Sequence, residues 1–301
     1  MGHGSYTSAD WTAFKAERKI TAHSTVSELY TSREMKSVYD PARIRVRESR
    51  DSADHPESNS IIFGLDVTGS MGYLSEEIAR DALNRTVCEI LEKKPVTDPQ
   101  ILFAALGDAS CDSAPLQVTQ FESDIRIAQQ LLDIYFEGRG GDEPESFNLP
   151  WYFAAKYTDI DCYNKRGRKG YLFTIGDATC RSDLTCQQIQ KVFGGGSQCD
   201  YSTRELYDMA SEKYHVFHVI VSRGELADYV CRYWDQLIPG KVIRVRKQEL
   251  KYLAEVITAA MQLTEGMALK DVLRQWDDEV AVAVAGCLEG FGKKKSGLFH
   301  F

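Results

Sequence analysis

The side chains best suited to chemistry stand in one short stretch, Asp66-Val67-Thr68-Gly69-Ser70, directly after the apolar run at residues 61–65. Alternate residues of an extended segment point to the same side, so the Asp66 carboxylate and the hydroxyls of Thr68 and Ser70 are expected to converge. Hard oxygen ligands of this kind suit Mg²⁺, which takes about six oxygens and keeps several waters. The turn is therefore predicted to hold a divalent cation: Mg²⁺, or the related ions Mn²⁺ or Ca²⁺.

A second acidic group is expected at the same place. The apolar run at residues 171–175 predicts a strand, and it ends at Gly176-Asp177. Ligands of open α/β sheets collect at the carboxyl ends of neighbouring strands, so we expect Asp177 to face Asp66. The glycine-rich acidic segment 138–146 is long enough to approach the same ion. Asp108, which follows another predicted strand, is expected nearby as a group that supports the ligands.

The elements that must position these groups alternate between strand and helix from residue 61 onward, which is typical of a doubly wound, mostly parallel α/β sheet flanked by helices. Strands are predicted at residues 61–65, 101–106, 116–118, 171–175, 216–221 and 242–245. Helices are predicted at residues 74–91, 124–135, 147–157, 204–214, 225–237 and 248–263. The pattern divides the chain into an N-terminal extension (1–58), a core domain (59–265) and a C-terminal helix and tail (266–301).

The flanking segments give weaker signals. In the extension, a helix is predicted near residues 9–19, and the alternating run 43–47 predicts a strand with one basic, exposed face. At the other end of the chain a single helix is predicted over residues 269–288. Within it, the stretch 280–284 fits a helix or a strand equally well, since periodicity does not separate the two.

Charge and composition exclude several classes of protein. The net charge is −8, and residues 59–265 carry all of the excess, with 30 acidic against 22 basic groups. Such a core is unsuited to nucleic acid, which needs a positive surface. No apolar run reaches the ~20 residues of a membrane-spanning helix, and the N-terminus does not resemble a signal peptide. Eight cysteines in a chain of 301 residues then predict reduced thiols and a cytoplasmic protein.

The order D-x-T-G-S, then a G-G loop, then a strand-end G-D resembles a von Willebrand factor A (vWA) domain with its metal-ion-dependent adhesion site, over about residues 60–265. The resemblance implies a sheet of about six strands and an ion held by Asp66, Thr68, Ser70 and Asp177. A carboxylate of a partner protein completes the coordination in that family. The run RESRDS ahead of LDVTGSMG is also similar to uncharacterised bacterial and tailed-phage members. Members that act inside cells imply a protein partner such as an AAA+ ATPase or an assembly subunit.

The middle loop departs from the family pattern. Where many members offer a Thr hydroxyl, this sequence has Asp142, followed by Glu143. If Asp142 takes the Thr position, three carboxylates around a dication leave the site near −1, which weakens its attraction for a further carboxylate. The site is then better suited to a neutral or basic partner, or to a structural ion. Glu143 and Glu145 are expected to be first-turn charges of the helix predicted from residue 147.

Two other classes of function fit parts of the pattern. The D-x-T-G-S turn also resembles the phosphoaspartate loop of haloacid-dehalogenase-like phosphatases. That resemblance implies Asp66 as the nucleophile, Asp177 and Asp183 as Mg²⁺ ligands, and Lys165 or Lys169 as the phosphate clamp. Most such phosphatases have a second Asp where Thr68 stands, to act as acid and base. The other alternative is a structural subunit of a phage or cellular assembly, whose ion only fixes loops. The favoured interpretation is a non-enzymatic, metal-dependent interaction module.

Overall fold

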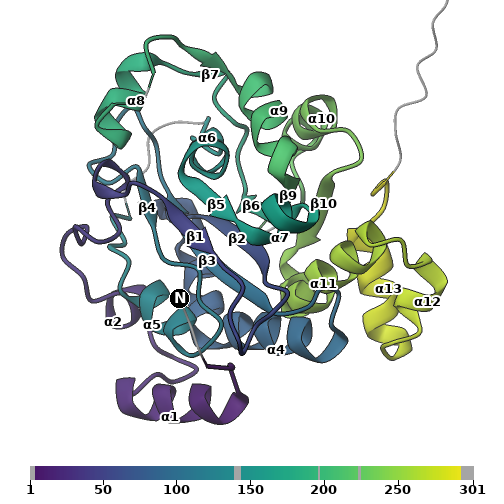
Figure 1. Cartoon of the computed structure of the whole chain (residues 1–301). Coiled ribbons are helices and arrows are strands. Elements are labelled where there is room, and N and C mark those ends of the chain that lie inside the picture. Colours follow the sequence, from purple (N-terminus) through teal and green to yellow (C-terminus); the bar gives the residue numbers. More distant parts are fainter. Residues whose placement is uncertain (1–3, 139–143, 196, 223–224, 293–301) are drawn as a thin grey trace, which may run out of the picture.

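The computed structural model describes residues 4–138, 144–195, 197–222 and 225–292. Its centre is a six-stranded sheet in the order β10-β9-β6-β2-β3-β4 (Figure 1). All neighbours are parallel except β4, which runs antiparallel to β3 at one edge. The strands are β2 (Asn59–Asp66), β3 (Pro99–Leu106), β4 (Leu116–Val118), β6 (Gly170–Gly176), β9 (Tyr214–Ser222) and β10 (Val242–Arg246). The predicted fold class is confirmed.

The central strands are covered on both faces, as their continuous apolar runs predict. All eight residues of β2 and all seven of β6 are buried. After β2 the chain builds β3 and β4 on one side, and then crosses to place β6 on the other side of β2. The point where the strand order reverses therefore lies between β2 and β6. In open sheets that crevice, at the carboxyl ends of the strands, is where ligands bind.

Helices cover the two faces of the sheet. The lower face in Figure 1 is covered by α4 (Leu83–Lys93), α5 (Arg126–Leu132) and α11 (Leu253–Thr264). α3 (Gly72–Glu77) and a π-helical turn (Ile78–Ala82) lead into α4, and a 3-10 turn (Lys247–Tyr252) leads into α11. Above the sheet lie α6 (Asn148–Tyr157), α8 (Cys186–Phe193), α9 (Thr203–Lys213) and α10 (Asp228–Leu237). Each face has its own apolar core. The lower core includes stacked rings from four adjacent strands, Phe103, Phe63, Phe173 and Phe217, with centroids 5.0–5.7 Å apart.

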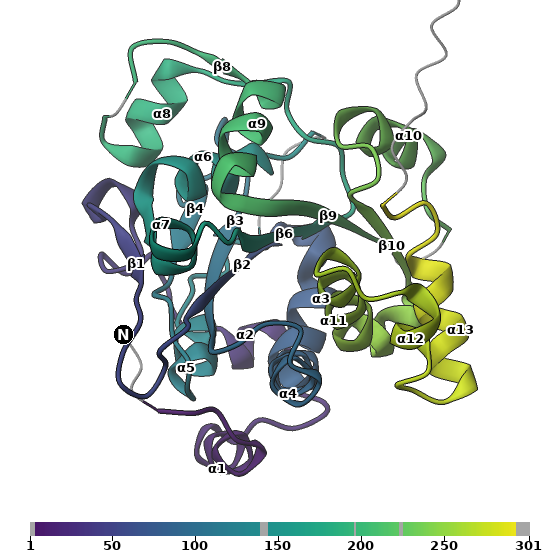
Figure 2. The same cartoon turned by 45° about the vertical axis from the view of Figure 1, so that its right-hand side comes forward.

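The N-terminal extension packs along this domain (Figures 1 and 2). It contains α1 (Ser8–Arg18), α2 (Val26–Leu29), a 3-10 turn (Pro41–Arg43) and β1 (Arg47–Ser49), which pairs in parallel with β5 (Thr158–Ile160). The helix predicted near residues 9–19 is confirmed. The strand predicted at residues 43–47 is wrong, because Asp40 accepts a hydrogen bond from the amide of Ala42 and caps the turn instead. The basic face is not exposed throughout: Arg47 is buried and donates to the carbonyl of Val118 at 3.0 Å.

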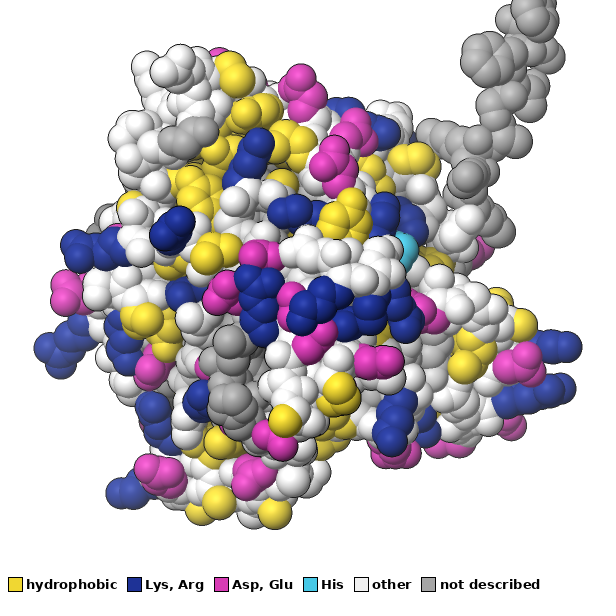
Figure 3. Space-filling model, viewed as in Figure 1, with side chains coloured by type: hydrophobic (Ala, Val, Ile, Leu, Met, Phe, Trp, Pro, Cys, Tyr) yellow, Lys and Arg dark blue, Asp and Glu magenta, His cyan; other side chains and the backbone are white. Residues whose placement is uncertain are grey.

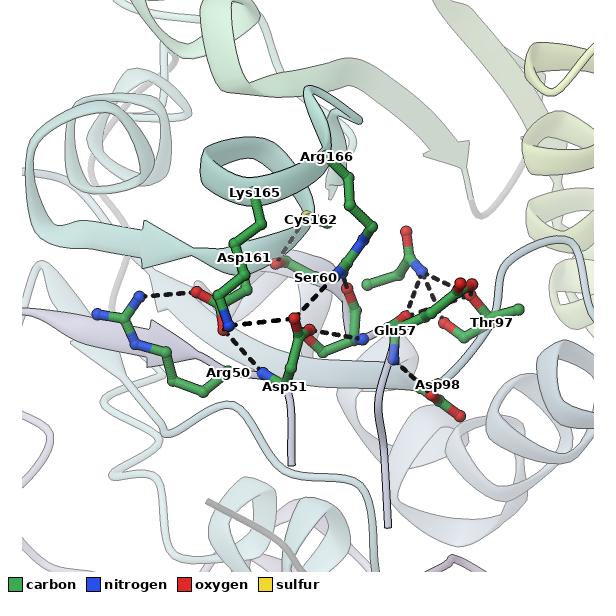
Figure 4. Close-up of polar contacts among 12 residues, drawn as sticks. Arg50, Asp51, Glu57, Ser60, Thr97, Asp98, Asp161, Cys162, Lys165 and Arg166 are labelled. Carbon is green, nitrogen blue, oxygen red and sulfur yellow. Dashed lines mark hydrogen bonds and ion pairs between the residues drawn. The ribbon is translucent and has the colours of Figure 1, made fainter. Parts of the chain in front are cut away.

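Ion pairs fasten the end of the extension to α7 (Asp161–Arg166), as Figure 4 shows. The Asp51 carboxylate accepts from Arg166 at 2.8 Å, from Lys165 at 3.2 Å and from the hydroxyl of Ser58 at 2.8 Å. Arg50 donates to Asp161 at 2.9 Å. We call these residues the Asp51 cluster; they lie where β2 and β6 begin. Figure 3 shows basic side chains gathered over α7 with acidic ones between them, so this face has mixed charge.

The C-terminal segment forms two helices, α12 (Leu269–Leu273) and α13 (Asp278–Cys287), rather than the single helix predicted. Asp277 separates them, because its side chain accepts from the amide of Val280 and caps α13. Residues 280–284 are helical. The sequence prediction also omitted the short hairpin of β7 (Asp183–Leu184) and β8 (Tyr201–Ser202). Among the described residues, none of the helices is long and apolar enough to cross a membrane. All eight cysteines are free.

Candidate metal centre

Asp66 and Asp177 lie at the tips of neighbouring strands. Asp66 is the last residue of β2, and Asp177 follows the last residue of β6. The parallel register pairs Leu65 with Ile175 directly before them. Only glycine fits between the two strands at position 176, because a Cβ there would stand 2.3 Å from the ring of Phe147 and 3.3 Å from the Cβ of Asp66. The predicted convergence of these two strand ends is present.

The turn after β2 is built around the Asp66 side chain. Its Oδ1 accepts a hydrogen bond from the amide of Thr68 at 2.8 Å, and the Thr68 hydroxyl donates to the same carboxylate. The chain then forms a 3-10 turn (Gly69–Met71) that contains Ser70 and leads directly into α3. Thr68 is buried beside Asp66. Thr68 therefore lies at the Asp66 carboxylate, and the predicted convergence of the Ser70 hydroxyl with this pair stays a prediction.

The other oxygen of Asp66 is the most informative atom of the centre. Asp66 is only 1% exposed, and its Oδ2 is buried without a hydrogen-bond partner among the described residues. Burial first, and then the charges of Asp177 and Asp112, raise the pKa of Asp66 to about 7, against the hydrogen bonds from Thr68. A buried ionised carboxylate with a free oxygen is costly unless a cation or a proton compensates it.

Glu145 provides a second carboxylate of the same kind. It is 6% exposed, and its Oε2 also has no partner among the described residues. Burial, followed by the charges of Asp66, Asp108 and Asp112, raises the pKa of Glu145 to about 8. Its backbone bridges to the segment after β6, since its amide donates to the carbonyl of Thr179 at 3.0 Å. Glu145 therefore faces the strand ends.

The predicted role of Glu145 as a first-turn helix charge is wrong, because α6 begins only at Asn148 and Glu145 lies ahead of it in an extended segment. Sequence reasoning misassigned this residue. Pro144 gave no warning, because proline is compatible with the first turn of a helix. Glu143 shares the same prediction but lies outside the described residues, as does Asp142, so their predicted places stay predictions.

Asp108 lies close to this pair but is already balanced. Its carboxylate accepts two hydrogen bonds from the guanidinium of Arg181, and the amide of Ser110 donates to it at 2.9 Å. Burial acts to raise the pKa of Asp108, but these hydrogen bonds outweigh it and lower the pKa. Asp108 is therefore a charged, fully engaged neighbour of Glu145 and leaves no oxygen to spare for an ion.

The donor set fits a hard cation. Within the described ranges, no three His, Cys, Asp or Glu side chains converge closely enough to hold an ion by themselves. Besides its carboxylate, the turn after β2 carries hydroxyl-bearing residues, Thr68 and Ser70. Two carboxylate oxygens, of Asp66 and Glu145, are buried without partners. Oxygen donors of this kind suit Mg²⁺ or Ca²⁺ better than softer metals.

The residues that the phosphatase alternative needs are not brought to this place. Lys165 pairs with Asp51 and Asp161 at the start of β6, and Lys169 donates to the carbonyl of Ser211. A seven-residue strand, roughly 20 Å long, separates this end of β6 from its tip. Asp183 is an exposed residue of the β7–β8 hairpin. The predicted roles of these two lysines as phosphate clamps are therefore wrong.

Comparison with solved structures finds vWA domains and adhesins among the similar folds. The pilus adhesin SpaC from Lactobacillus rhamnosus GG matches 76% of this chain and 31% of its own, at 11% identity and a TM-score of 0.45. The vWF domain of the pilus tip protein Mfa5 from Porphyromonas gingivalis matches 75% of this chain and 98% of its own, at 8% identity and a TM-score of 0.43. A von Willebrand factor type A protein from Catenulispora acidiphila matches 70% of this chain and 43% of its own, at 12% identity and a TM-score of 0.36.

The chain thus spans about a third of the length of the adhesin. Identities this low, with TM-scores below 0.5, give no argument about function. No protein-family model matches the sequence, and no curated protein matches it either. Function has to be argued from the strand ends themselves.

Proposed function

We propose that this chain is a vWA-type interaction module that holds one divalent cation, Mg²⁺ by preference, at the tips of β2 and β6 and uses it to bind a partner protein. Asp66, Thr68, Ser70 and Asp177 are the proposed ligands, together with Asp142 from the middle loop, and Glu145 is a neighbouring carboxylate whose charge attracts the ion. The observation that carries the proposal is the buried Oδ2 of Asp66 without a partner. When bound, the ion supplies an open coordination position for an oxygen of the partner.

The charge of the centre favours a neutral oxygen from that partner. The carboxylates of the proposed site, Asp66, Asp142, Glu145 and Asp177, together bring about −4 against the +2 of the ion, and Asp108 is balanced separately by Arg181. A further carboxylate would meet repulsion inside a poorly solvated crevice, whereas a backbone carbonyl, an amide or a hydroxyl would not. The partner group proposed here therefore differs from the carboxylate that the family resemblance implies.

The proposal also covers the compartment in which the partner is met and the kind of partner. A cytoplasmic module with eight free thiols is suited to a partner inside the cell. An AAA+ ATPase or a subunit of a multi-protein assembly is the proposed kind of partner. A protein that only fixes its own loops with the ion would instead be a structural subunit.

Affinity purification from the native host with and without EDTA, followed by mass spectrometry, tests the proposal. We expect at least one protein to be captured in Mg²⁺, lost in EDTA, and lost from the variants Asp66→Asn and Ser70→Ala. Asp183→Asn is the matched control, because this aspartate is exposed and lies on the β7–β8 hairpin. Capture that ignores both EDTA and the two variants would contradict the proposal, and metal-dependent assembly of identical subunits would favour the structural role.

A direct assay distinguishes the phosphohydrolase alternative from the proposed interaction module. Hydrolysis of p-nitrophenyl phosphate that disappears in Asp66→Asn would support it. We expect no Asp66-dependent hydrolysis, because Lys165 and Lys169 lie at the other end of β6 from the proposed nucleophile.

A further inference from the structure

The excursion between β6 and α9 carries two cysteines at its mouth. The hairpin of β7 and β8 closes this excursion, and α8 lies within it, at the upper left of Figures 1 and 2. Cys186 is the first residue of α8, and Cys199 lies two residues ahead of β8. Neither cysteine belongs to the proposed metal centre.

The register of the hairpin sets the two cysteines opposite each other. Leu184 pairs with Tyr201 in the last step of the antiparallel ladder. Two steps further along the same register stand Cys186 and Cys199. Directly opposite residues of antiparallel strands have Cα atoms about 4.5–5.5 Å apart, and a disulfide spans roughly 4.4–6.8 Å between Cα atoms.

Two features carry this register past the end of the ladder. Thr185 is still extended, with φ −74° and ψ 155°. The carboxylate of Asp200 accepts a hydrogen bond from the amide of Cys186 at 2.7 Å. Because Asp200 is the chain neighbour of Cys199, this bond holds the backbones of the two cysteines together just where the two segments begin to part.

The two thiols differ in their exposure to solvent. Cys199 is exposed, whereas Cys186 is half-buried. The exposed thiol of a redox pair is the one that an oxidant reaches first, and a neighbouring thiol then resolves the oxidised form into a disulfide. Disulfides formed in this way in the cytosol are usually transient, since thiol reductants reverse them.

We infer that Cys186 and Cys199 are a peroxide-sensitive pair whose disulfide closes the mouth of the hairpin and fixes α8. The thiolate of Cys199 attacks one oxygen of hydrogen peroxide, which breaks the O–O bond and gives a sulfenic acid and water. The thiolate of Cys186 then attacks that sulfur: the S–S bond forms, the S–O bond breaks, and the oxygen leaves as water with the proton that the thiol has lost. Two thiols lose two electrons, and one peroxide is reduced to two waters.

Fixing α8 has a consequence for the loop after β3. Lys191 of α8 donates to the carbonyls of Ala109 and Asp112 at 3.0 and 3.1 Å, and Gln188 donates to the hydroxyl of Ser110 at 3.2 Å. This loop begins beside the proposed metal centre. Oxidation therefore holds in place a helix that supports the loop, and it changes none of the proposed ligands.

Peptide mass spectrometry of the full-length protein, treated with hydrogen peroxide and then alkylated, tests the inference. Trypsin places Cys186 and Cys199 in different peptides, 182–191 and 192–204, and Cys180 in a third, 170–181. We expect the linked pair of 182–191 and 192–204 to rise at least tenfold over the untreated protein and to disappear with dithiothreitol. Cys186→Ser should abolish the link and leave Cys199 as a sulfenic acid that dimedone labels.

Cys111→Ser is the matched control, because Cys111 is also exposed and its loop contacts α8. This variant should form the link as the wild type does. Mixing isotope-labelled with unlabelled protein shows whether a link joins one molecule or two. The pairing is overturned if the wild type forms no link, if Cys199 joins Cys111 instead, or if the link joins two molecules.

Amide hydrogen exchange tests the effect on α8. We expect exchange in residues 187–193 to be at least threefold slower in the oxidised wild type than in the reduced protein, because the helix can no longer swing away from the hairpin. In Cys199→Ser, peroxide should leave the rate unchanged. A disulfide that forms without slowing this exchange would overturn its role in fixing the helix.

Discussion

The guanidinium of Arg181 donates two hydrogen bonds to the carboxylate of Asp108, at 2.8 Å from Nε and 2.5 Å from Nη2. Asp108 is nearly buried and Arg181 is 27% exposed. The pair joins the loop after β3 to the segment after β6. The charge of Asp108 acts to raise the pKa of Glu145 and that of Arg181 acts to lower it, so Arg181 limits the repulsion that Asp108 adds beside the metal centre.

Removing Arg181 alone should be costly. In Arg181→Met the Asp108 carboxylate stays buried without its cation, so we expect a loss of ~3 kcal/mol in the free energy of unfolding. Urea unfolding of the metal-free protein measures it. The double variant Arg181→Met/Asp108→Asn should recover much of the loss, since no buried charge is then left unpaired. A double variant as unstable as the single one would show that packing of Arg181, and not its charge, is what matters.

Metal binding should raise thermal stability. If Mg²⁺ binds the folded protein only, at ~100 times its dissociation constant it should add about 2.7 kcal/mol, which differential scanning calorimetry detects as a higher Tm. Asp66→Asn should abolish the rise, because the Oδ2 that faces the centre no longer carries charge. Asp183→Asn serves as control and should respond like the wild type. An equal rise in Asp66→Asn would place the ion elsewhere.

Glu145→Gln separates a role in binding the ion from a role in holding the fold. The substitution keeps the shape of the side chain and removes a buried charge that has no partner for Oε2. We expect the metal-free protein to be as stable as the wild type or more so, and the affinity for Mg²⁺, measured by calorimetric titration, to fall at least tenfold. Lower stability with unchanged affinity would make Glu145 a structural residue only.

The Asp51 cluster should make stability depend on acidity. Burial acts to raise the pKa of Asp51, but hydrogen bonds from Arg166, Ser58 and Lys165 outweigh it and hold the pKa well below its ordinary value. The unfolded chain then binds the proton more readily, so this contribution is fully present above about pH 5 and fades as the pH falls below about 4. Unfolding curves between pH 7 and pH 3 should show the loss in the wild type.

In Asp51→Asn we expect ~2 kcal/mol less stability at pH 7, because Arg166 and Lys165 lose a shared carboxylate, and a smaller difference from the wild type at pH 3. Asp54→Asn, a nearby exposed aspartate, is the comparison. A difference between Asp51→Asn and the wild type that does not shrink on acidification would rule out the ionised form of Asp51 as its source.

Much of the sheet could be predicted from sequence because its strands are buried on both faces. All six strands predicted for the core domain are present, and β4 (Leu116–Val118) has the predicted bounds. The errors lie where one polar side chain decides the backbone. Asp40 turns a predicted strand into a 3-10 turn, and Asp277 divides a predicted helix in two. Apolar periodicity carries no information about such caps.

The candidate centre was predictable only in part, for a related reason. Asp66 and Asp177 follow apolar strands, and the rule for open sheets places them together. Glu145 follows no strand of its own: it reaches the same place through a single bridge to the segment after β6, across 35 residues of chain, from Glu145 to Cys180. A contact of that sort depends on the finished fold, and spacing in the sequence does not reveal it.

The pairing of β1 with β5 determines how late in synthesis and folding β1 can take its final place. Arg47 pairs with Thr158, so β1 cannot join a sheet until more than a hundred later residues have been made and ordered. Closing so large a loop is slow. Until then β1 is an unpaired strand, although α1 can already pack against α4, where Tyr6 and Ser8 contact Asn84 and Cys88. A nascent chain halted before residue 158 would therefore carry an unpaired strand edge at β1 and would be a natural substrate for chaperones.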